Sequence, residues 1–284
     1  MNDKEKKTYT EANRLAWNET MPHHQKANGT KWDNAFSAPG FVALSSREQE
    51  LLKSIGVSGK KIAHLCCNNG IELMSLKNMG ADRCVGFDIS DEAIKEASGR
   101  SEKVGIPCEF ERTDVYEIPE RHRGVFDIVY ISIGCFGWLP DLKQFFEKVA
   151  MLLCDEGTLF IHEQHPFAEM LPSDDDEGAD PLKIIEPYFK AEPYQENSGI
   201  DYVGKTTYES MTQYWFVWTL SDIIMGIVEN DIEIVHFSEY PEDISAIHGK
   251  NQNAGIEIPL SYTMISRKKR HNNTMHADAD KPRR

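Results

Sequence analysis

The feature that most constrains the fold of this chain is a strand–turn–helix–strand unit between Ile62 and Asp88. Residues 62–65 form an apolar strand, and a turn with a single glycine leads into an amphipathic helix that ends before Gly80. A second apolar strand follows and ends at Asp88. Strands that alternate with helices of this length favour parallel pairing through right-handed crossovers, so the segment predicts an α/β sheet.

The same alternation continues to residue 162, is interrupted by a segment that begins at residue 166, and ends with a helix and two strands up to residue 265. A capping box of Ser45 and Glu48 opens a helix before the first strand, and Ser90 caps the helix after the second strand. Further strands are expected at residues 107–110, 126–133, 158–162, 232–237 and 258–265. Because the chain ends in helix, strand, strand, we expect a Rossmann-like, seven-stranded, mostly parallel sheet with a final antiparallel strand and helices on both faces.

Composition divides the chain into five expected segments. They are an N-terminal cap at 1–44, the core at 45–165, a lid or insertion at 166–217, the C-terminal part of the core at 218–267 and a disordered tail at 268–284. The insertion is rich in proline, acidic and aromatic residues, which suits a lid over a flat substrate and equally a contact in a homodimer. The tail is polar and partly basic and has no apolar periodicity.

The charge and the cysteines argue against several classes of function. The formal net charge is −15, and a surface this acidic repels phosphates, so nucleic acid is not an expected partner. No apolar run reaches the ~20 residues of a membrane span, and the charged start lacks the apolar centre of a signal peptide. A cytoplasmic protein without a membrane partner is therefore expected. None of the six cysteines forms a CxxC pair, which predicts free thiols and no metal site.

The turn after the first strand and the acid after the second form an adenosine-binding arrangement. The N-terminus of the helix beyond the turn favours a carboxylate or a phosphate, and Asp88 can accept both hydroxyls of a ribose. Asp114, after the third strand, is placed to take an adenine amino group. The GxGxxG pattern of dinucleotide sites is absent, which favours S-adenosylmethionine over NAD. A NAD-linked oxidoreductase is the alternative enzyme class.

Four segments resemble the motifs of the class I S-adenosylmethionine-dependent methyltransferase family. They are IAHLCCNNGIEL, GFDIS, RTDVYEIP and FDIVYISIGCFGWL, within a resemblance that covers roughly residues 55–270. NRLAWNETMPHHQ and HEQHPF resemble, more narrowly, a branch that acts on small molecules. The first motif departs from the family pattern, since His64 replaces its acid and Cys66 and Asn68 replace two glycines. A non-catalytic protein with a methyltransferase-like fold is therefore a third alternative.

The resemblance implies a part of the cofactor for each motif. Cys67, Asn68 and Gly70 are expected beside the methionine part, Asp88 and Ile89 beside the ribose, Asp114 and Val115 beside the adenine, and Ser132 and Ile133 behind the sulfonium. Cys67 is expected to be a small neighbour of the cofactor rather than a nucleophile, because the sequence places no histidine or aspartate to activate it. Trp17 has two interpretations: packing of an amphipathic helix, and a cap whose aromatic face suits the sulfonium charge.

Candidates for acceptor contact and proton transfer lie after later strands and in the flanking segments. His162, Glu163, Trp138, Tyr188 and Trp215 are expected to contact a small-molecule acceptor. His162 has a second interpretation as a packed strand residue. His165, or alternatively His24, is expected to remove a proton from the acceptor, because imidazole suits that role at neutral pH. The expected reaction is methyl transfer to nitrogen or oxygen of a small molecule.

Overall fold

The structure of the protein, a computed structural model, describes residues 1–270. Its helices are α1 (Asp3–Asn28), α2 (Lys31–Phe36), α3 (Ser46–Ser54), α4 (Ile71–Asn78), α5 (Asp91–Val104), α6 (Leu142–Leu152), α7 (Leu220–Val228) and α8 (Gly249–Gln252). Its strands are β1 (Lys61–Leu65), β2 (Arg83–Asp88), β3 (Glu109–Arg112), β4 (Phe126–Ile131), β5 (Leu153–Gln164), β6 (Tyr194–Glu196), β7 (Gln213–Trp215), β8 (Ile232–Tyr240) and β9 (Ser261–Lys268). Four short 3₁₀ helices are η1 (Val115–Glu117), η2 (Glu120–His122), η3 (Phe136–Trp138) and η4 (Ala168–Met170).

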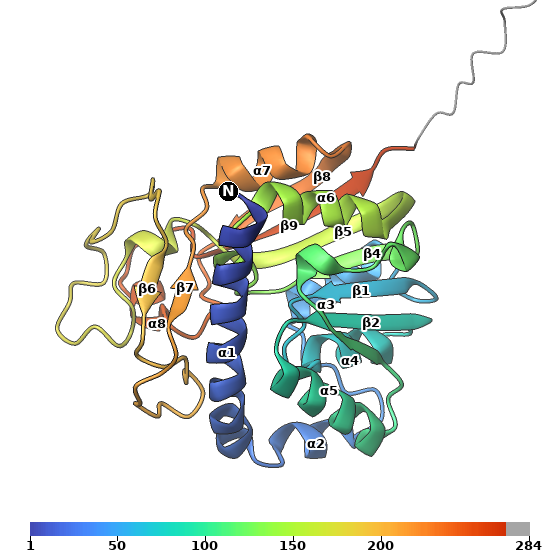
Figure 1. Ribbon diagram of the computed structural model, residues 1–284, viewed down its shortest axis with the longest axis horizontal. Coiled ribbons are helices and arrows are strands. Elements are labelled where there is room, and N and C mark those ends of the chain that lie inside the picture. Colours follow the sequence, from blue (N-terminus) through green and yellow to red (C-terminus); the bar gives the residue numbers. More distant parts are fainter. Residues whose placement is uncertain (271–284) are drawn as a thin grey trace, which may run out of the picture.

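Seven strands form one sheet in the order β3-β2-β1-β4-β5-β9-β8, which confirms the predicted architecture (Figure 1). The strands β3, β2, β1, β4 and β5 pair in parallel, and β9 pairs antiparallel with both β5 and β8. The crossovers after β1, β2 and β4 carry helices, as parallel pairing requires. The carboxyl ends of β3, β2, β1, β4 and β5 therefore meet along one edge of the sheet.

Helices cover both faces of the sheet and enclose two hydrophobic cores. On one face α6 and α7 contribute Phe145, Phe146 and Ile227, each fully buried. On the other face α3 and α4 contribute Leu52 and Leu73, also fully buried. Both predicted helix caps are present, since Ser45 and Glu48 form the capping box of α3 and Ser90 caps α5. Within residues 1–270 no helix is both long and apolar enough to span a membrane.

Three strands begin two or more residues away from the expected position, because pairing with neighbouring strands extends or shifts them. β3 begins at Glu109 rather than at residue 107, opposite Val85 of β2. β5 begins at Leu153, directly after α6, and not at residue 158. β9 covers 261–268, three residues later than expected, since its register is set by β5 and β8.

The placement of Lys268 in a disordered tail was wrong. This residue ends β9, and its Nζ donates hydrogen bonds to the carbonyls of Ala150 (2.7 Å) and Leu153 (2.8 Å) at the C-terminal end of α6. A cation there satisfies helix carbonyls that have no partner within the helix. Lys269 and Arg270 follow β9, and the predicted tail from residue 271 onward lies outside the described residues.

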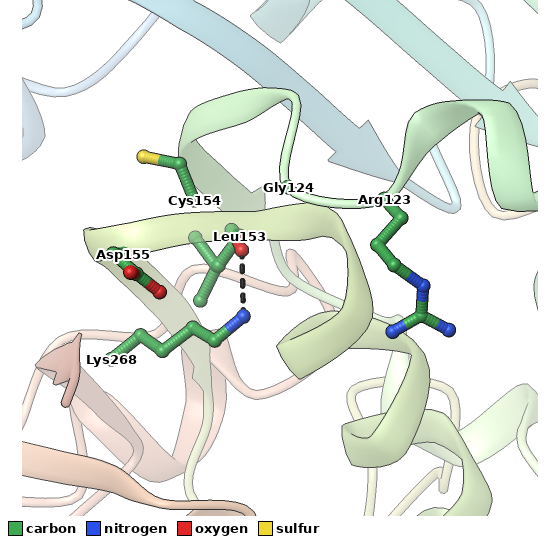
Figure 2. Close-up of a pocket in the computed structure, with 6 residues that line it drawn as sticks. All are labelled: Arg123, Gly124, Leu153, Cys154, Asp155 and Lys268. Atoms are coloured by element: carbon green, nitrogen blue, oxygen red, sulfur yellow. Dashed lines mark hydrogen bonds between the residues drawn. The ribbon is translucent and has the colours of Figure 1, made fainter. Parts of the chain in front are cut away.

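Lys268 also lines a pocket at the amino end of β5 (Figure 2). The other lining residues are Arg123, Gly124, Leu153, Cys154 and Asp155. Since Leu153 is the first residue of β5, the pocket lies at the sheet edge opposite the carboxyl ends of the parallel strands. Open α/β sheets bind their ligands at the carboxyl ends, so this pocket is not the candidate functional site.

Residues 166–217 contain an antiparallel hairpin, in which Tyr194 of β6 pairs with Trp215 of β7. The long helix α1 contacts α5 on one side and β7 on the other. In Figure 1 this helix, in blue, stands between the sheet with its flanking helices and the β6–β7 hairpin. The N-terminal segment and the insertion therefore pack on each other beside the core.

Candidate cofactor and acceptor site

The turn between β1 and α4 adopts left-handed backbone angles at every second residue. The φ angle is 54° at Cys66, 45° at Asn68 and 74° at Gly70. Such an angle costs a residue with a side chain about 1–2 kcal/mol, and asparagine tolerates it better than most residues. These are the positions at which the methyltransferase pattern has glycines. The two replacements thus keep the backbone path that glycines would allow.

Hydrogen bonds and close packing hold this turn against β2. The N–H of Cys67 donates to the carbonyl of Phe87 at 3.0 Å, and the N–H of Gly70 donates to the carbonyl of Cys67 at 3.0 Å. A Cβ atom at Gly70 would lie 2.6 Å from Cε1 of Phe110, and one at Gly86 would lie 2.7 Å from Sγ of Cys67. Burial raises the pKa of the Cys67 thiol well above its usual value. Cys67 therefore occupies a packing position, unsuited to a thiolate nucleophile.

Asp88 ends β2 with its carboxylate directed at this turn. Its Oδ2 accepts the N–H of Asn68 at 2.8 Å, and its Oδ1 accepts the N–H of Ser90 at 2.8 Å. The side chain is half-buried, and burial raises its pKa. Each carboxylate oxygen keeps a further lone pair, so two ribose hydroxyls could bind without breaking the bonds to the turn. The cap of α5 comes from the Ser90 hydroxyl, which accepts the N–H of Ala93 at 3.1 Å.

Asp114 lies at the same sheet edge, because β3 pairs in parallel with β2. One of its carboxylate oxygens accepts the N–H of Tyr116 at 3.1 Å and caps η1. Burial raises the pKa of this carboxyl group. Val115 is only 8% exposed and packs in the core beside it, whereas Ile89 is half-buried. The turn, Asp88 and Asp114 thus follow three adjacent strands and lie along one edge of the sheet.

His64 lies beneath the turn and contacts Ser132, the first residue after β4. Its Nε2 is 3.0 Å from Oγ of Ser132, and its ring meets Tyr130 edge to face at 4.9 Å between centroids. The ring is fully buried, and burial lowers its pKa to about 3. The histidine in place of the family's acid is therefore neutral. It joins the ends of β1 and β4, whereas Ile133 beyond them is half-buried.

The buried His64 ring gives the folding stability a predictable pH dependence. Its folded pKa lies below its unfolded value of about 6.5, so the unfolded state alone takes up a proton as the pH falls below that value. Stability is fully present above pH ~6.5 and is lost at up to about 1.4 kcal/mol per pH unit below it. Urea unfolding at pH 8 and at pH 5.5 should show a larger loss for the wild type than for His64→Asn. Equal losses would contradict a neutral buried histidine.

Three tryptophans from separate segments meet above the carboxyl end of β4. The ring centroids of Trp17 and Trp138 are 5.3 Å apart, and those of Trp138 and Trp215 are 4.9 Å apart. A Cβ at Gly137 would lie 2.3 Å from the ring of Trp215, so the indole rests directly on the η3 backbone. The indole N–H of Trp215 donates to Glu169 at 3.2 Å. The N-terminal segment, the loop after β4 and the insertion are thus joined at one aromatic cluster, Trp17–Trp138–Trp215.

Glu163 fixes the loop that carries one of these tryptophans. Its carboxylate accepts the N–H groups of Gly134 at 2.7 Å and Cys135 at 2.9 Å. The side chain is 4% exposed, and burial raises its pKa to about 7. Its observed contacts are with backbone, which gives Glu163 a positioning role toward Trp138.

His162, the residue before Glu163 on β5, packs against α3. Its Nδ1 is 3.1 Å from Oε1 of Glu48, and the same oxygen accepts the hydroxyl of Tyr130 at 2.8 Å. The ring is 5% exposed. This geometry favours the second interpretation of His162, as a packed strand residue.

The remaining candidates lie in different surroundings. His165 is buried, its Nδ1 accepts the N–H of Phe167 at 3.0 Å, and its Nε2 is 2.9 Å from a carboxylate oxygen of Glu239. His24 is also buried, and its Nε2 lies 3.1 Å from the carbonyl of Ile200 in the insertion. The hydroxyl of Tyr188 accepts the backbone N–H of Leu220 at the start of α7. Tyr188 is therefore bound to α7.

One residue near the site carried no signal in the sequence. Arg100 of α5 donates to the carbonyl of Asn69 in the turn at 3.0 Å. These two residues lie far apart in sequence, and hydrophobic periodicity says nothing about such pairs. Asn18 of α1, next to Trp17 in the segment expected to pack on the core or to cap the cofactor, accepts a hydrogen bond from the hydroxyl of Ser90.

The turn with three left-handed residues, the acid after β2 and the acid after β3 lie at the carboxyl ends of three adjacent parallel strands, where open α/β sheets bind their ligands. Residues 62–157 match the family model described as "Methyltransferase domain". They therefore form a methyltransferase domain of class I, the family whose methyl donor is S-adenosylmethionine.

Relatives and solved structures agree with this assignment. A ubiquinone biosynthesis O-methyltransferase from Psychrobacter cryohalolentis is 26% identical over 155 residues, which are 51% of this chain and 58% of the relative. The chain spans about half the length of the curated relatives it matches.

Two solved structures share the fold at low sequence identity. A S-adenosylmethionine dependent methyltransferase from Mesorhizobium loti has a TM-score of 0.52 at 18% identity, covering 79% of this chain and 99% of that one. A geranyl diphosphate C-methyltransferase from Streptomyces coelicolor has a TM-score of 0.54 at 11% identity, covering 79% and 78%. O- and C-methyltransferases thus both stand among the similar proteins, and the fold does not separate acceptor atoms.

Proposed function

We propose that this protein is a S-adenosylmethionine-dependent methyltransferase that transfers a methyl group to nitrogen or oxygen of a small molecule. The observation that carries the proposal is the Asp88 carboxylate, which is bonded to the left-handed turn through Asn68 and keeps lone pairs for a ribose. When bound, the cofactor would supply an activated methyl group on a sulfonium. The contributions of the protein would be to bind it, to orient the acceptor and to exclude water.

The described residues divide these tasks by position. Asp88 would hold the ribose, and the backbone of the turn with the N-terminus of α4 would face the carboxylate of the methionine part. The Trp17–Trp138–Trp215 cluster would cover the reacting atoms, since its members come from the cap, the core and the insertion. The N–H bonds of Glu163 would keep the loop after β4 in place beneath the cluster.

Calorimetry with S-adenosylmethionine, S-adenosylhomocysteine and NAD tests the function directly. Binding of S-adenosylhomocysteine without binding of NAD is expected. Binding of NAD alone would overturn the proposal in favour of the oxidoreductase, which is disfavoured by the absent GxGxxG pattern. Binding of none of the three would leave the non-catalytic interpretation. An acceptor that turns over at carbon would overturn the nitrogen or oxygen part alone.

We expect a histidine to take the acceptor proton, and the contacts favour His24 over His165. A ring nitrogen bonded to a carbonyl must carry the proton, so Nε2 of His24 donates to Ile200 and its Nδ1 keeps a lone pair. Burial lowers the pKa of His24, which keeps it neutral at pH 7. In His165 the Nδ1 lone pair is already occupied by Phe167.

His24→Ala should therefore lower kcat at least tenfold on an acceptor that supports turnover, and His165→Ala should lower it less. Affinity for S-adenosylhomocysteine should stay within about threefold of the wild type in both variants, a difference of about 0.7 kcal/mol. His236→Ala on β8, whose ring contacts Ser238, serves as the matched control. Wild-type turnover in both of the first two variants would show that neither histidine is the base.

A further inference from the structure

Helix α1 contacts the cofactor side of the core and the insertion at the same time. It packs on α5, whose N-terminus follows Asp88, and on β7 of the hairpin. Figure 1 shows the helix between these two parts of the molecule. Two asparagines of this helix bond in opposite directions, Asn18 to the core and Asn13 to the insertion, and the proposed mechanism uses neither.

Asn18 binds Ser90, whose backbone N–H donates to Asp88, and also the next residue, Asp91. Its Oδ1 accepts the hydroxyl of Ser90 at 2.8 Å, and its Nδ2 donates to Oδ2 of Asp91 at 2.8 Å. The backbone N–H of Ser90 donates to Asp88, so a single residue separates Asn18 from the ribose acceptor. Arg14, one turn earlier in α1, forms an ion pair with Asp91. The core side of α1 is therefore attached at the cofactor-binding acid.

Asn13 binds the insertion through both backbone groups of one residue. Its Oδ1 accepts the N–H of Tyr214 at 2.7 Å, and its Nδ2 donates to the carbonyl of Tyr214 at 2.9 Å. The asparagine is 2% exposed. Tyr214 is the middle residue of β7 and precedes Trp215, which packs on Trp138. Farther along α1, Thr20 shares a 2.7 Å hydrogen bond with the hydroxyl of Tyr208.

We infer that Asn18 and Asn13 are positioning residues through which α1 couples cofactor binding to closure of the insertion at 166–217 as a lid. The inference rests on the proposed function, because the coupled ligand is the S-adenosyl cofactor. A cofactor that fixes Asp88 and Ser90 fixes the core side of α1, and the same rigid helix then holds β7. By linkage, a closed lid tightens cofactor binding by the same factor by which the cofactor favours closure.

Two measurements on the full chain distinguish the role of Asn18, toward the cofactor, from that of Asn13, toward the insertion. Calorimetry gives the affinity for S-adenosylhomocysteine, and limited trypsin digestion reports the lid, which offers Lys183, Lys190 and Lys205 for cleavage. In the wild type, saturating S-adenosylhomocysteine should slow cleavage at these lysines at least fivefold. The digestion is read by mass spectrometry so that cuts elsewhere in the chain are not counted.

Each variant should lose a different part of this behaviour. Asn18→Ala should bind S-adenosylhomocysteine about tenfold more weakly, because it loses a hydrogen bond beside a charged group. Asn13→Ala should lose most of the ligand-dependent protection and weaken the affinity only by the factor of protection that is lost, as linkage requires. The double variant Asn13→Ala/Tyr208→Phe should lose more of this protection than Asn13→Ala does. Asn28→Ala, at the far end of the same helix, is the control and should behave as the wild type.

The outcomes distinguish failure of the coupling from failure of the function. Wild-type affinity in Asn18→Ala, or full protection in the Asn13→Ala/Tyr208→Phe variant, would overturn the coupling while the function stands. No binding of S-adenosylhomocysteine to the wild type would overturn both. Alanine favours helix, so α1 should persist in the variants, and melting curves check this. If Asn13→Ala fails to fold, Asn13→Asp keeps the acceptor for the N–H of Tyr214, places a carboxylate oxygen against the Tyr214 carbonyl in place of the donor, and should likewise lose most of the protection.

Discussion

Replacing Asp88 with asparagine is expected to weaken S-adenosylhomocysteine binding at least 100-fold, a loss of about 2.7 kcal/mol. The carboxylate accepts two backbone N–H groups and is left with one lone pair on each oxygen for the ligand. An amide has a single acceptor oxygen, so its NH₂ group would face either Asn68 or Ser90. The variant thus loses a charge-assisted acceptor for ribose and also disturbs the turn that faces the methionine part.

Asp127→Asn is the matched control for this experiment. Asp127 is also a strand aspartate that accepts a backbone N–H, from Lys61 at 2.8 Å, but it lies near the amino end of β4. Its replacement should cost similar stability and leave the affinity unchanged. Comparable affinity in Asp88→Asn and the wild type would show that the acid after β2 does not hold the ligand, and the proposed function would lose its main support.

The role expected of Asp88 could be derived from the sequence because the alternatives were also visible there. An acid at a strand end often caps the next helix, and Ser90 already stood in the capping position, as the structure bears out. The mostly parallel, seven-stranded sheet with a final antiparallel strand followed in the same way from the alternation of apolar segments. Local patterns that recur with a fixed period are thus recovered well from one sequence.

The turn before α4 could not be derived in this way. Cysteine has no preference for a left-handed angle, so the φ of 54° at Cys66 is imposed by the surrounding hydrogen bonds and packing rather than by its own propensity. The contacts of Glu48 show the same limit. Its role in the capping box was evident, whereas its bonds to Tyr130 and His162 depend on strands that are distant in sequence.

The contacts of the aromatic residues of the insertion are a further feature that the sequence alone could not predict. Trp215 joins Trp138 and Trp17, but Tyr188, from the same aromatic-rich segment, binds the start of α7 instead. Composition predicted an aromatic lid without saying which rings would meet. A segment with little periodicity gives no register, so its side chains are assigned to partners only by the tertiary structure.

Gly70→Ala is expected to destabilise the fold by about 2–4 kcal/mol, because two costs add at this position. The residue has a φ of 74°, and an added Cβ would lie 2.6 Å from a ring carbon of Phe110 and 3.1 Å from the Cβ of Ala97. Asn68→Gly, two residues earlier, should relieve backbone strain and not add it, because it introduces a glycine at a φ of 45°. Its unfolding free energy should stay within about 1 kcal/mol of the wild type.

Urea unfolding of both variants measures these changes, and a double-mutant cycle divides the cost at Gly70. Phe110→Ala removes the ring that the new Cβ would meet, so Gly70→Ala should cost less in that background, by about 1–3 kcal/mol. The remaining cost is the left-handed backbone, which no change at Phe110 relieves. If Gly70→Ala costs the same in both backgrounds, the close approach to Phe110 contributes nothing. If Asn68→Gly destabilises as much as Gly70→Ala, the turn does not depend on left-handed angles at these positions.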